Sequence, residues 1–406
     1  MRTLRIAMVL LLAAGLPAAC GGGGHTPPRA LTDSEQAVVA ASNDFGFDLF
    51  REVSARAAGR DVFISPLSVS LALGMTLNGA AGQTRQEMAA VLDLTGLDEE
   101  QANQAYRGLI DMLTQMDSKV SLEIANSIWH RDDFQVEDAF LDVNRRSFDA
   151  EVAGLDFDDP GAADVINDWV SDATHGCIDS IVDGIPPAVV MYLINAVYFY
   201  GDWTRAFKAQ QTEDETFYAP DGELTVPMMH LREEGLDYMS NDRVQAIRLP
   251  YGREYFHMTV VLPAPDQDLD ALIAELDTAT WNEWQAAFTH QEGHLALPRF
   301  SLSYETTLNT VLQALGMQSA FDPNLADLSR INPQAELFIS EVRHKSFVRV
   351  DERGTEAAAV TSVSVGATGV PQTFDMRVDR PFLFVIHDLH SGALLFMGEI
   401  HRPAGA

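Results

Sequence analysis

The chain has 406 residues, 47% of them hydrophobic, so it can bury a large core as one big domain or two ordinary ones. Its 27 basic and 59 acidic residues give a formal net charge of −32 at pH 7. This charge repels phosphate backbones, anionic lipids and polyanionic polysaccharides, which argues against nucleic acid or such polysaccharides as partners, and we interpret the acidity as a solvated surface.

The first residues have the pattern of an export signal. Arg2 and Arg5 precede the apolar run 6–16, which is too short to span a membrane but suits the core of a signal peptide. We therefore predict a signal peptide over residues 1–19. Its removal takes away two arginines and changes the net charge from −32 to −34.

Leu-Pro-Ala-Ala-Cys at 16–20 resembles a bacterial lipoprotein cleavage box, with Pro17 where leucine is usual. This resemblance predicts lipidation of Cys20, a flexible tether over 20–32 and a place in the cell envelope, at the outer membrane or cell surface. The alternative is ordinary cleavage and secretion. Cys177 is the only other cysteine, so no disulfide is expected, and we interpret it as a small structural residue rather than a nucleophile.

Hydrophobic periodicity predicts helices through the first half of the chain. Capping-box patterns at Thr32–Glu35 and Thr84–Glu87 open two of them, and Ser65 with Pro66 opens another. The predicted helices cover about 33–58, 66–77, 84 onward, 99–116, 138–147, 161–174, 269–276 and 306–315.

Strand patterns increase after residue 120. The run 189–200 is apolar on both faces, which is typical of a central strand in a sheet covered on each side, and Asn195 is its only strongly polar member. The other predicted strands are 62–65, 120–129, 225–229, 244–250, 256–263, 294–300, 338–342, 347–350, 381–386 and 393–397.

The stretch 351–371 is small and nearly uncharged after Glu356, and it connects two strand patterns. Composition alone suits a linker or a short alanine-rich helix. Read with a period of two, however, one face would carry threonine, alanine and valine and could be buried as a strand, with Gly354 as a hinge before it. A long connection inside one globular unit is usually functional.

Several stretches over about 33–403 together resemble the serpin family. They include Phe-Ile-Ser-Pro-Leu-Ser at 63–68, Leu-Ile-Asn-Ala-Val-Tyr-Phe-Tyr-Gly-Asp-Trp at 193–203, Leu-Pro-Arg-Phe at 297–300 and Pro-Phe at 381–382. The most diagnostic piece is Glu-Arg-Gly-Thr-Glu-Ala-Ala-Ala at 352–359, similar to the hinge of inhibitory members. It marks Glu352, Gly354, Thr355, Glu356, Ala357, Ala358 and Ala359 as hinge residues.

The resemblance implies an α+β serpin fold in one domain, residues 33–403: a large mostly antiparallel central sheet, smaller sheets, about nine helices and an exposed reactive-centre loop over 352–371. It further implies a metastable, monomeric suicide inhibitor without cofactors, which traps a serine endopeptidase as an acyl-enzyme while the cleaved loop inserts into the main sheet. From Thr355 to Thr368 there are fourteen residues, about 46 Å as a strand. A charged residue or a proline on the inward face would stall insertion, and none lies there between Thr355 and Val365.

The family's spacing places the reactive bond at Thr368–Gly369. No lysine or arginine occurs between Gly354 and Met376, which argues against a trypsin-like target. The small and β-branched residues around the bond favour an elastase-like or subtilisin-like protease.

Further positions match the family by motif. Ser65, Ser68, Asn195 and His344 correspond to a hydrogen-bonded cluster where strands part for insertion, although they are also readable as ordinary buried polar groups. Trp203 corresponds to the point where the loop enters the sheet, and Arg299 is a candidate partner for Glu352.

Enzyme signatures are absent from the sequence: there is no Gly-x-Ser-x-Gly, phosphate loop or dinucleotide fingerprint. We interpret His290 and His294 as part of a polar connection, and the acidic run 266–270 as a helix N-terminus rather than a calcium loop, so no metal site is predicted. The rival functions are cross-class inhibition of a papain-like cysteine protease and a non-inhibitory serpin used as a binding module or chaperone.

Overall fold

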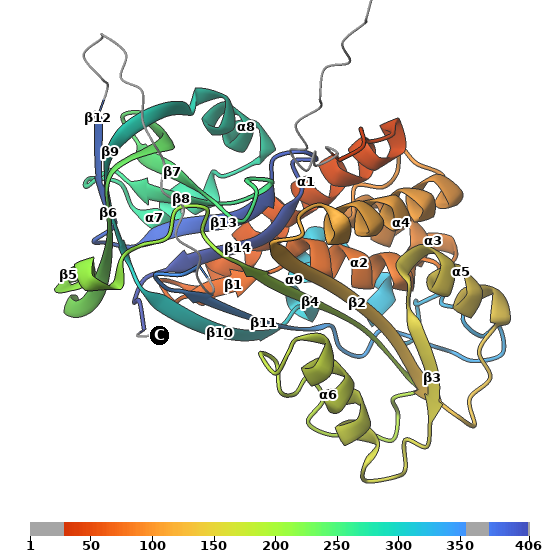
Figure 1. Cartoon of the computed structure of the whole chain (residues 1–406). Helices are drawn as coiled ribbons and strands as arrows, with labels where there is room; N and C mark the ends of the chain where they lie inside the picture. Colours follow the sequence, from red (N-terminus) through yellow and green to blue (C-terminus); the bar gives the residue numbers. More distant parts are fainter. Residues whose placement is uncertain (1–27, 355–372, 405–406) are drawn as a thin grey trace, which may run out of the picture.

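The computed structural model describes residues 28–354 and 373–404 (Figure 1). Most of the helices lie around one end of the strands. None of the helices in the described residues has the length and apolar content needed to cross a bilayer. Their α-helices are α1 (Asp33–Ala57), α2 (Pro66–Leu77), α3 (Gly82–Val91), α4 (Glu99–Gln115), α5 (Asp138–Phe148), α6 (Ala162–Ala173), α7 (Leu269–Ala274), α8 (Thr278–Ala287) and α9 (Asn309–Leu315), with short 3-10 turns η1 (Ala209–Gln211) and η2 (Ser319–Phe321).

Local capping chemistry fixes where the first helices begin. The Thr32 hydroxyl accepts from the Glu35 amide while the Glu35 carboxylate accepts from the Thr32 amide, a complete capping box. Ser65 caps α2, with Pro66 at the first helical position, as its sequence predicts.

The predicted cap at Thr84 is wrong. Helix α3 begins two residues earlier, at Gly82, and no side chain caps it. Thr84 is fully buried instead, and its hydroxyl contacts the Ser319 hydroxyl at 3.1 Å and accepts from the Asp327 amide at 2.9 Å. A tertiary contact has replaced the local one.

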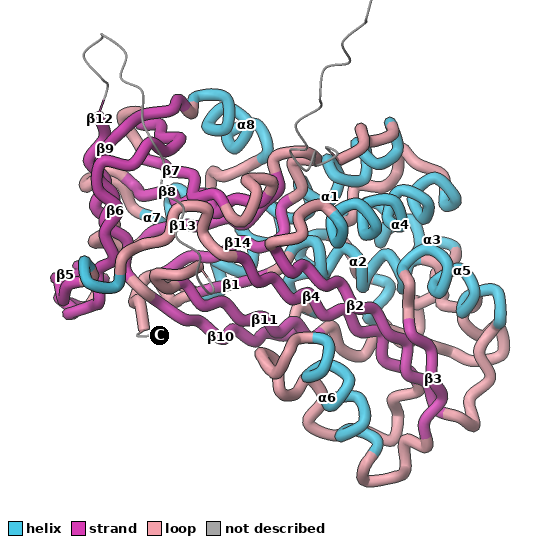
Figure 2. The backbone as a smooth tube through the Cα atoms, viewed as in Figure 1, coloured by secondary structure: helices cyan, strands magenta, loops and turns pink. Residues whose placement is uncertain are grey.

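The largest sheet of the described residues has nine strands (Figure 2). All its ladders are antiparallel except that of β12 on β9. Phe63, in the short strand at one end of the sheet, stacks on Phe384 and Phe396 at ring-centroid distances of 5.5 and 5.2 Å. These contacts join that strand to the core. The strand order is β1 (Val62–Ile64), β14 (Leu394–Ile400), β13 (Phe382–Asp388), β8 (Phe256–Pro263), β7 (Val244–Pro250), β6 (Gly222–Ser240), β9 (Thr289–Pro298) and β12 (Thr373–Arg377), with β5 (Glu213–Ala219) also on β6.

Two smaller sheets adjoin the helices. One has the order β3 (Glu151–Leu155), β2 (Val120–Arg131), β4 (Met191–Gly201), and the other pairs β10 (Phe300–Thr307) with β11 (Arg343–Val350). Strand β4 packs against both α2 and α6, so the prediction that both its faces are covered is confirmed. The prediction that it is a central strand is wrong in the described residues, where β4 pairs with β2 alone.

The segment 338–342, predicted as a strand, is not one. The Ile339 amide donates to Ala320 O at 2.8 Å, and the Leu308 amide donates to Val342 O at 2.8 Å. These bonds attach the segment to η2 and the start of α9, and β11 begins only at Arg343.

The buried side chains form two cores. The main core includes the large sheet and α1, α2 and α4, whereas a small second core lies between α6, β2 and β4. In the second core the rings of Trp129 and Trp169 meet edge to face at 6.1 Å. Its buried members are Trp129, Phe157, Ile166, Val170, Ile178, Val182 and Ile194.

Candidate functional site

The residues at the start of the predicted loop lie against the end of β4. The Trp203 amide donates to Arg353 O at 3.1 Å, and the Phe207 amide donates to Glu352 O at 2.9 Å. The Trp203 indole N–H donates to Asp351 O at 2.9 Å. The chain leaving β11 is therefore held by backbone bonds where β4 ends.

Gly354 is the last residue described before the loop. Its φ is +74°, a conformation that L side chains rarely adopt. A Cβ atom there would lie 2.2 Å from Trp203 N and 2.7 Å from Gly201 O. Both the backbone angle and the close approach to the end of β4 therefore require glycine.

The Glu352 side chain has two partners at this point. The predicted one is present, with Arg299 Nη1 at 3.7 Å from Glu352 Oε1. The closer one is Thr212, whose hydroxyl donates to the same oxygen at 2.7 Å and which the sequence did not indicate. The Trp203 ring, whose indole N–H binds the preceding residue Asp351, stacks on Tyr251 at 4.3 Å.

Three of the four residues of the proposed sheet-opening cluster are linked in the interior. His344 Nε2 accepts from the Ser65 amide at 3.1 Å, so the proton of the neutral ring is on Nδ1. The Ser65 hydroxyl donates to Leu395 O at 2.7 Å and accepts from the Ser68 amide at 3.2 Å. Complete burial lowers the pKa of His344 to about 4.

Asn195 joins the cluster mainly through its backbone. The Ser68 hydroxyl donates to Asn195 O at 3.5 Å, a long bond, and the Asn195 amide group donates to Asn126 Oδ1 at 2.7 Å. Asn126 lies directly opposite on β2 and donates in turn to Phe148 O at 2.6 Å. Sequence reasoning missed Asn126, although its position as an amide inside an otherwise ordinary strand pattern was the same signal that singled out Asn195.

Strands β4 and β11 flank a cavity of about 720 Å³. Its lining includes residues 191–195 of β4, residues 343–345 of β11 and, from α2, Ser68, Val69, Ala72, Leu73 and Thr76. Strand β11 pairs with β10, and no ladder joins it to β4 in the part of the chain that the structure describes. The interval between these two strands is therefore hollow rather than hydrogen-bonded.

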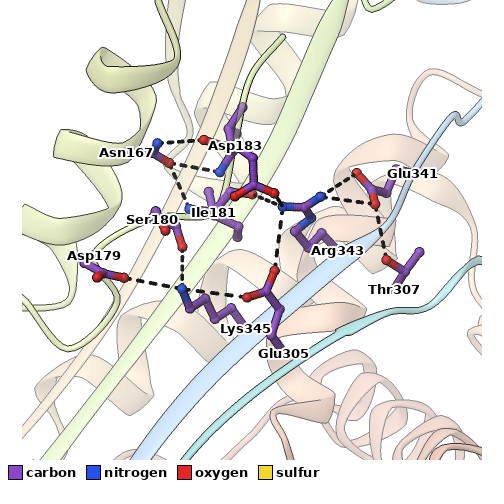
Figure 3. Close-up of polar contacts among 11 residues, drawn as sticks. Asn167, Asp179, Ser180, Ile181, Asp183, Glu305, Thr307, Glu341, Arg343 and Lys345 are labelled. Carbon is purple, nitrogen blue, oxygen red and sulfur yellow. Dashed lines mark hydrogen bonds and ion pairs between the residues drawn. The ribbon is translucent and has the colours of Figure 1, made fainter. Parts of the chain in front are cut away.

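A group of charged side chains reaches across this interval (Figure 3). Arg343 Nη1 lies 2.7 Å from Asp183 Oδ2 and donates to Ile181 O at 3.3 Å, while Lys345 Nζ donates to Ser180 O at 3.0 Å. We call these contacts between β11 and residues 179–183, the segment connecting α6 to β4, the β11 clasp. Sequence reasoning missed it, because its partners are about 160 residues apart.

The remaining predicted site residues lie outside the described residues. These are Cys20, the hinge residues Thr355, Glu356, Ala357, Ala358 and Ala359, and the reactive bond Thr368–Gly369. Cys177 is described and is exposed, so no core packing supports the interpretation of it as a structural residue. Partial desolvation raises the pKa of its thiol, which disfavours the nucleophilic thiolate.

Comparison with known proteins identifies the family. The model of the serpins, described as serine protease inhibitors, matches residues 40–403. This chain belongs to the serpin family. Among curated serpins it is 33% identical to the leukocyte elastase inhibitor of Xenopus tropicalis over 374 residues, covering 89% of this chain and 98% of that one.

One more curated serpin and one solved serpin structure are similar to this chain over most of its length. The corticosteroid-binding globulin of Oryctolagus cuniculus is 30% identical over 384 residues, covering 94% of this chain and 97% of that protein. The crystal structure of the thermophilic serpin tengpin in the native state has a TM-score of 0.82 at 31% identity, covering 93% and 96%. The serpin fold predicted from the motifs is therefore confirmed, and serpins are mainly protease inhibitors rather than enzymes.

Proposed function

We propose that this serpin irreversibly inhibits a serine endopeptidase of elastase-like or subtilisin-like specificity by trapping it as an acyl-enzyme. The observation that carries the proposal is the hinge geometry. The Glu352 and Arg353 carbonyls accept from amides just after β4, beside the interval where β4 and β11 are not paired. A chain released by cleavage beyond Gly354 would start at the point where a strand could enter.

The lengths are compatible with insertion. The fourteen residues from Thr355 to Thr368 would span about 46 Å as a strand. Strand β4 has eleven residues, so the inserted segment could pair along all of it. New backbone hydrogen bonds and burial of the threonine, alanine and valine face would drive the step.

The target class rests on the bait residues. The absence of lysine and arginine between Gly354 and Met376 argues against proteases whose pocket needs a cation. Small and β-branched residues such as Val365, Ala367 and Thr368 suit shallow apolar pockets. A relative named leukocyte elastase inhibitor adds support for this class.

We further propose that the protein is exported by a bacterium and anchored in its envelope through acylated Cys20, as a monomer without cofactors. The signal-peptide pattern over 1–19 and the cleavage box ending at Cys20 support this proposal. If Cys20 is not acylated, the protein is secreted. Radiolabelled palmitate incorporation that is lost in Cys20→Ala tests the anchor.

The inhibitory function is tested by incubating the purified protein with elastase-like, subtilisin-like and papain-like proteases. We expect a complex with one of the first two that survives denaturing electrophoresis, and release of a C-terminal fragment that begins near Gly369. Thr368→Arg should move inhibition towards trypsin. If trypsin remains uninhibited by that variant, the assigned bond is wrong.

Two other functions remain as outcomes of the same test. A stable complex only with the papain-like protease would establish cross-class inhibition. Clean cleavage without any complex, and without a rise in thermal stability, would instead support a non-inhibitory binding role. A relative named corticosteroid-binding globulin makes that role the natural second candidate.

A further inference from the structure

Three side chains that the protease-inhibitor proposal does not use meet near the C-terminal end of β14, in the large sheet. Glu399 is near the end of β14, His401 follows that strand, and Asp270 is in the first turn of α7. One ligand-type atom from each lies within 4.8 Å of the others. The acidic run 266–270, interpreted from sequence as a helix start, therefore also supplies a carboxylate to a cluster made elsewhere in the chain.

Glu399 is buried with only one of its two carboxylate oxygens partnered. It is 1% exposed, and its Oε1 atom has no hydrogen-bond partner in the described part of the chain. Its neighbours across the sheet, Val62 and Leu383, are apolar. A buried carboxylate with an unpartnered oxygen is costly, so Glu399 would be stabilised by a cation or a proton donor bound beside it.

The spacing of the cluster suits a metal ion. His401 Nε2 is 3.3 Å from Glu399 Oε2 and 3.5 Å from Asp270 Oδ1. Two ligand atoms at about 2.1 Å from a tetrahedral zinc ion lie about 3.4 Å apart. The observed separations therefore need little adjustment to place an ion between the three side chains.

The backbone around His401 is already held in place. Asp61 Oδ1 accepts from the amides of His401 at 2.6 Å and Arg402 at 3.0 Å. His401 itself is 3% exposed, whereas Asp270 is exposed. Two ligands are thus fixed in the interior and the third is at the surface, which leaves a route for the ion and for a coordinating water.

We propose that Asp270, Glu399 and His401 form a binding site for a divalent transition-metal cation, zinc being the best match for one imidazole and two carboxylates. The ion would connect α7 to the end of β14 and the C-terminal segment. Without the ion, the imidazole contacts the two carboxylates directly, which is the alternative use of the same geometry.

Isothermal titration of the full chain, freed of metals by a chelator, with ZnCl2 tests the proposal. We expect one high-affinity site and an increase in Tm of a few degrees on saturation. Glu399→Gln and His401→Ala should each weaken binding at least about ten-fold. If these buried changes prevent folding, Asp270→Asn, at an exposed position, should still weaken binding.

The matched control is His294→Ala. His294 lies in a different histidine-containing group, with its Nε2 atom 3.0 Å from His230 Nδ1. This control should bind zinc as the unchanged chain does. Absence of zinc binding, binding lost in the control instead, or undiminished affinity in all three cluster variants would each overturn the proposal. Because none of these measurements involves a protease, failure of the inhibitor proposal leaves the metal-site proposal intact.

Discussion

At the scale of single residues, Gly354 determines how closely the start of the loop approaches β4. Gly354→Ala should destabilise the native protein because it adds a backbone clash with Trp203 and Gly201 to the cost of a positive φ. Gly392→Ala is the matched control, since Gly392 has φ +79° but open space around its Cβ. We expect a loss of about 1–2 kcal/mol in the control from the backbone conformation alone.

In urea unfolding, Gly354→Ala should exceed the control by at least about 1 kcal/mol, since overpacking against fixed backbone adds its own cost. Equal losses in the two variants would mean that the contact between Gly354 and the end of β4 contributes nothing to native stability.

His344 couples the buried cluster to pH. Its folded pKa is about 4, below the value of about 6.5 expected in the unfolded chain, so the unfolded state binds the proton first. The stability contributed by neutral His344 is therefore complete above about pH 6.5 and is lost as pH falls towards 4, a change of about 3 kcal/mol. Burial also lowers the pKa values of His257 and His387, which act in the same direction.

His344→Gln keeps an acceptor for the Ser65 amide but cannot take up the proton. The free energy of unfolding should therefore depend less steeply on pH between 4 and 6.5 in this variant, by up to about 1.4 kcal/mol per pH unit. Urea unfolding at several pH values measures the slope. The same substitution at partly exposed His390 should not reproduce the effect, and an unaltered slope in His344→Gln would contradict the prediction.

At the scale of elements, alternation along β11 assigns its side chains to two roles. His344, Ser346, Val348 and Val350 are buried on one face, and Arg343 and Lys345 on the other form the β11 clasp. The acidic partners Asp179 and Asp183 are highly exposed, so the ion pairs themselves contribute little. The donations to the carbonyls of Ser180 and Ile181 connect β11 to the α6–β4 segment directly.

Arg343→Met should therefore loosen residues 179–183 locally while leaving the main core unchanged. Amide hydrogen exchange should report a lower opening free energy for this segment, by about 1 kcal/mol for the lost hydrogen bond. Arg330→Met is the control. It removes two hydrogen bonds to Glu99 elsewhere in the molecule and should leave exchange in 179–183 unaltered. Identical exchange in both variants would show that the clasp does not hold the segment.

Local patterns predicted most elements, because caps and periodicity are properties of neighbouring residues. Thr32, Ser65 and the alternating run 120–129 were sufficient for α1, α2 and β2. Thr84 and the segment 338–342 were misassigned because distant groups, Asp327 and Ala320, bind them in the fold.

The candidate site also divides into residues that local patterns predicted and residues that depend on distant contacts. The family motifs identified the hinge and the buried cluster, whereas Asn126, Thr212 and the β11 clasp depend on contacts between segments far apart in the chain. No pattern within one segment reports which distant segment will pack beside it, so these contacts could be seen only in three dimensions.

At the scale of the whole molecule, the proposed function requires the cleaved loop to become a strand with one buried face. The alternating pattern assigns Thr361 to the inward face and Ser362 to the outward face, a prediction from sequence because both lie outside the described residues. Thr361→Arg should block insertion, since burying an unpaired charge is strongly unfavourable. The target protease should then cleave this variant without forming a stable complex.

Ser362→Arg is the matched control and should still form the complex. Calorimetry provides a second measurement: cleavage should raise the unfolding temperature of the control but not of Thr361→Arg. If both variants trap the protease equally well, the loop does not insert in the assigned register.

The second core under α6 makes the two faces of β4 unequal. Helix α2 covers one face as part of the main core, so exposing that face means unfolding the molecule. Helix α6 covers the other through a small core of its own, which we expect to open locally more readily than the main core. In the native state, antibodies should therefore reach the face of β4 under α6 more readily than the face that α2 covers.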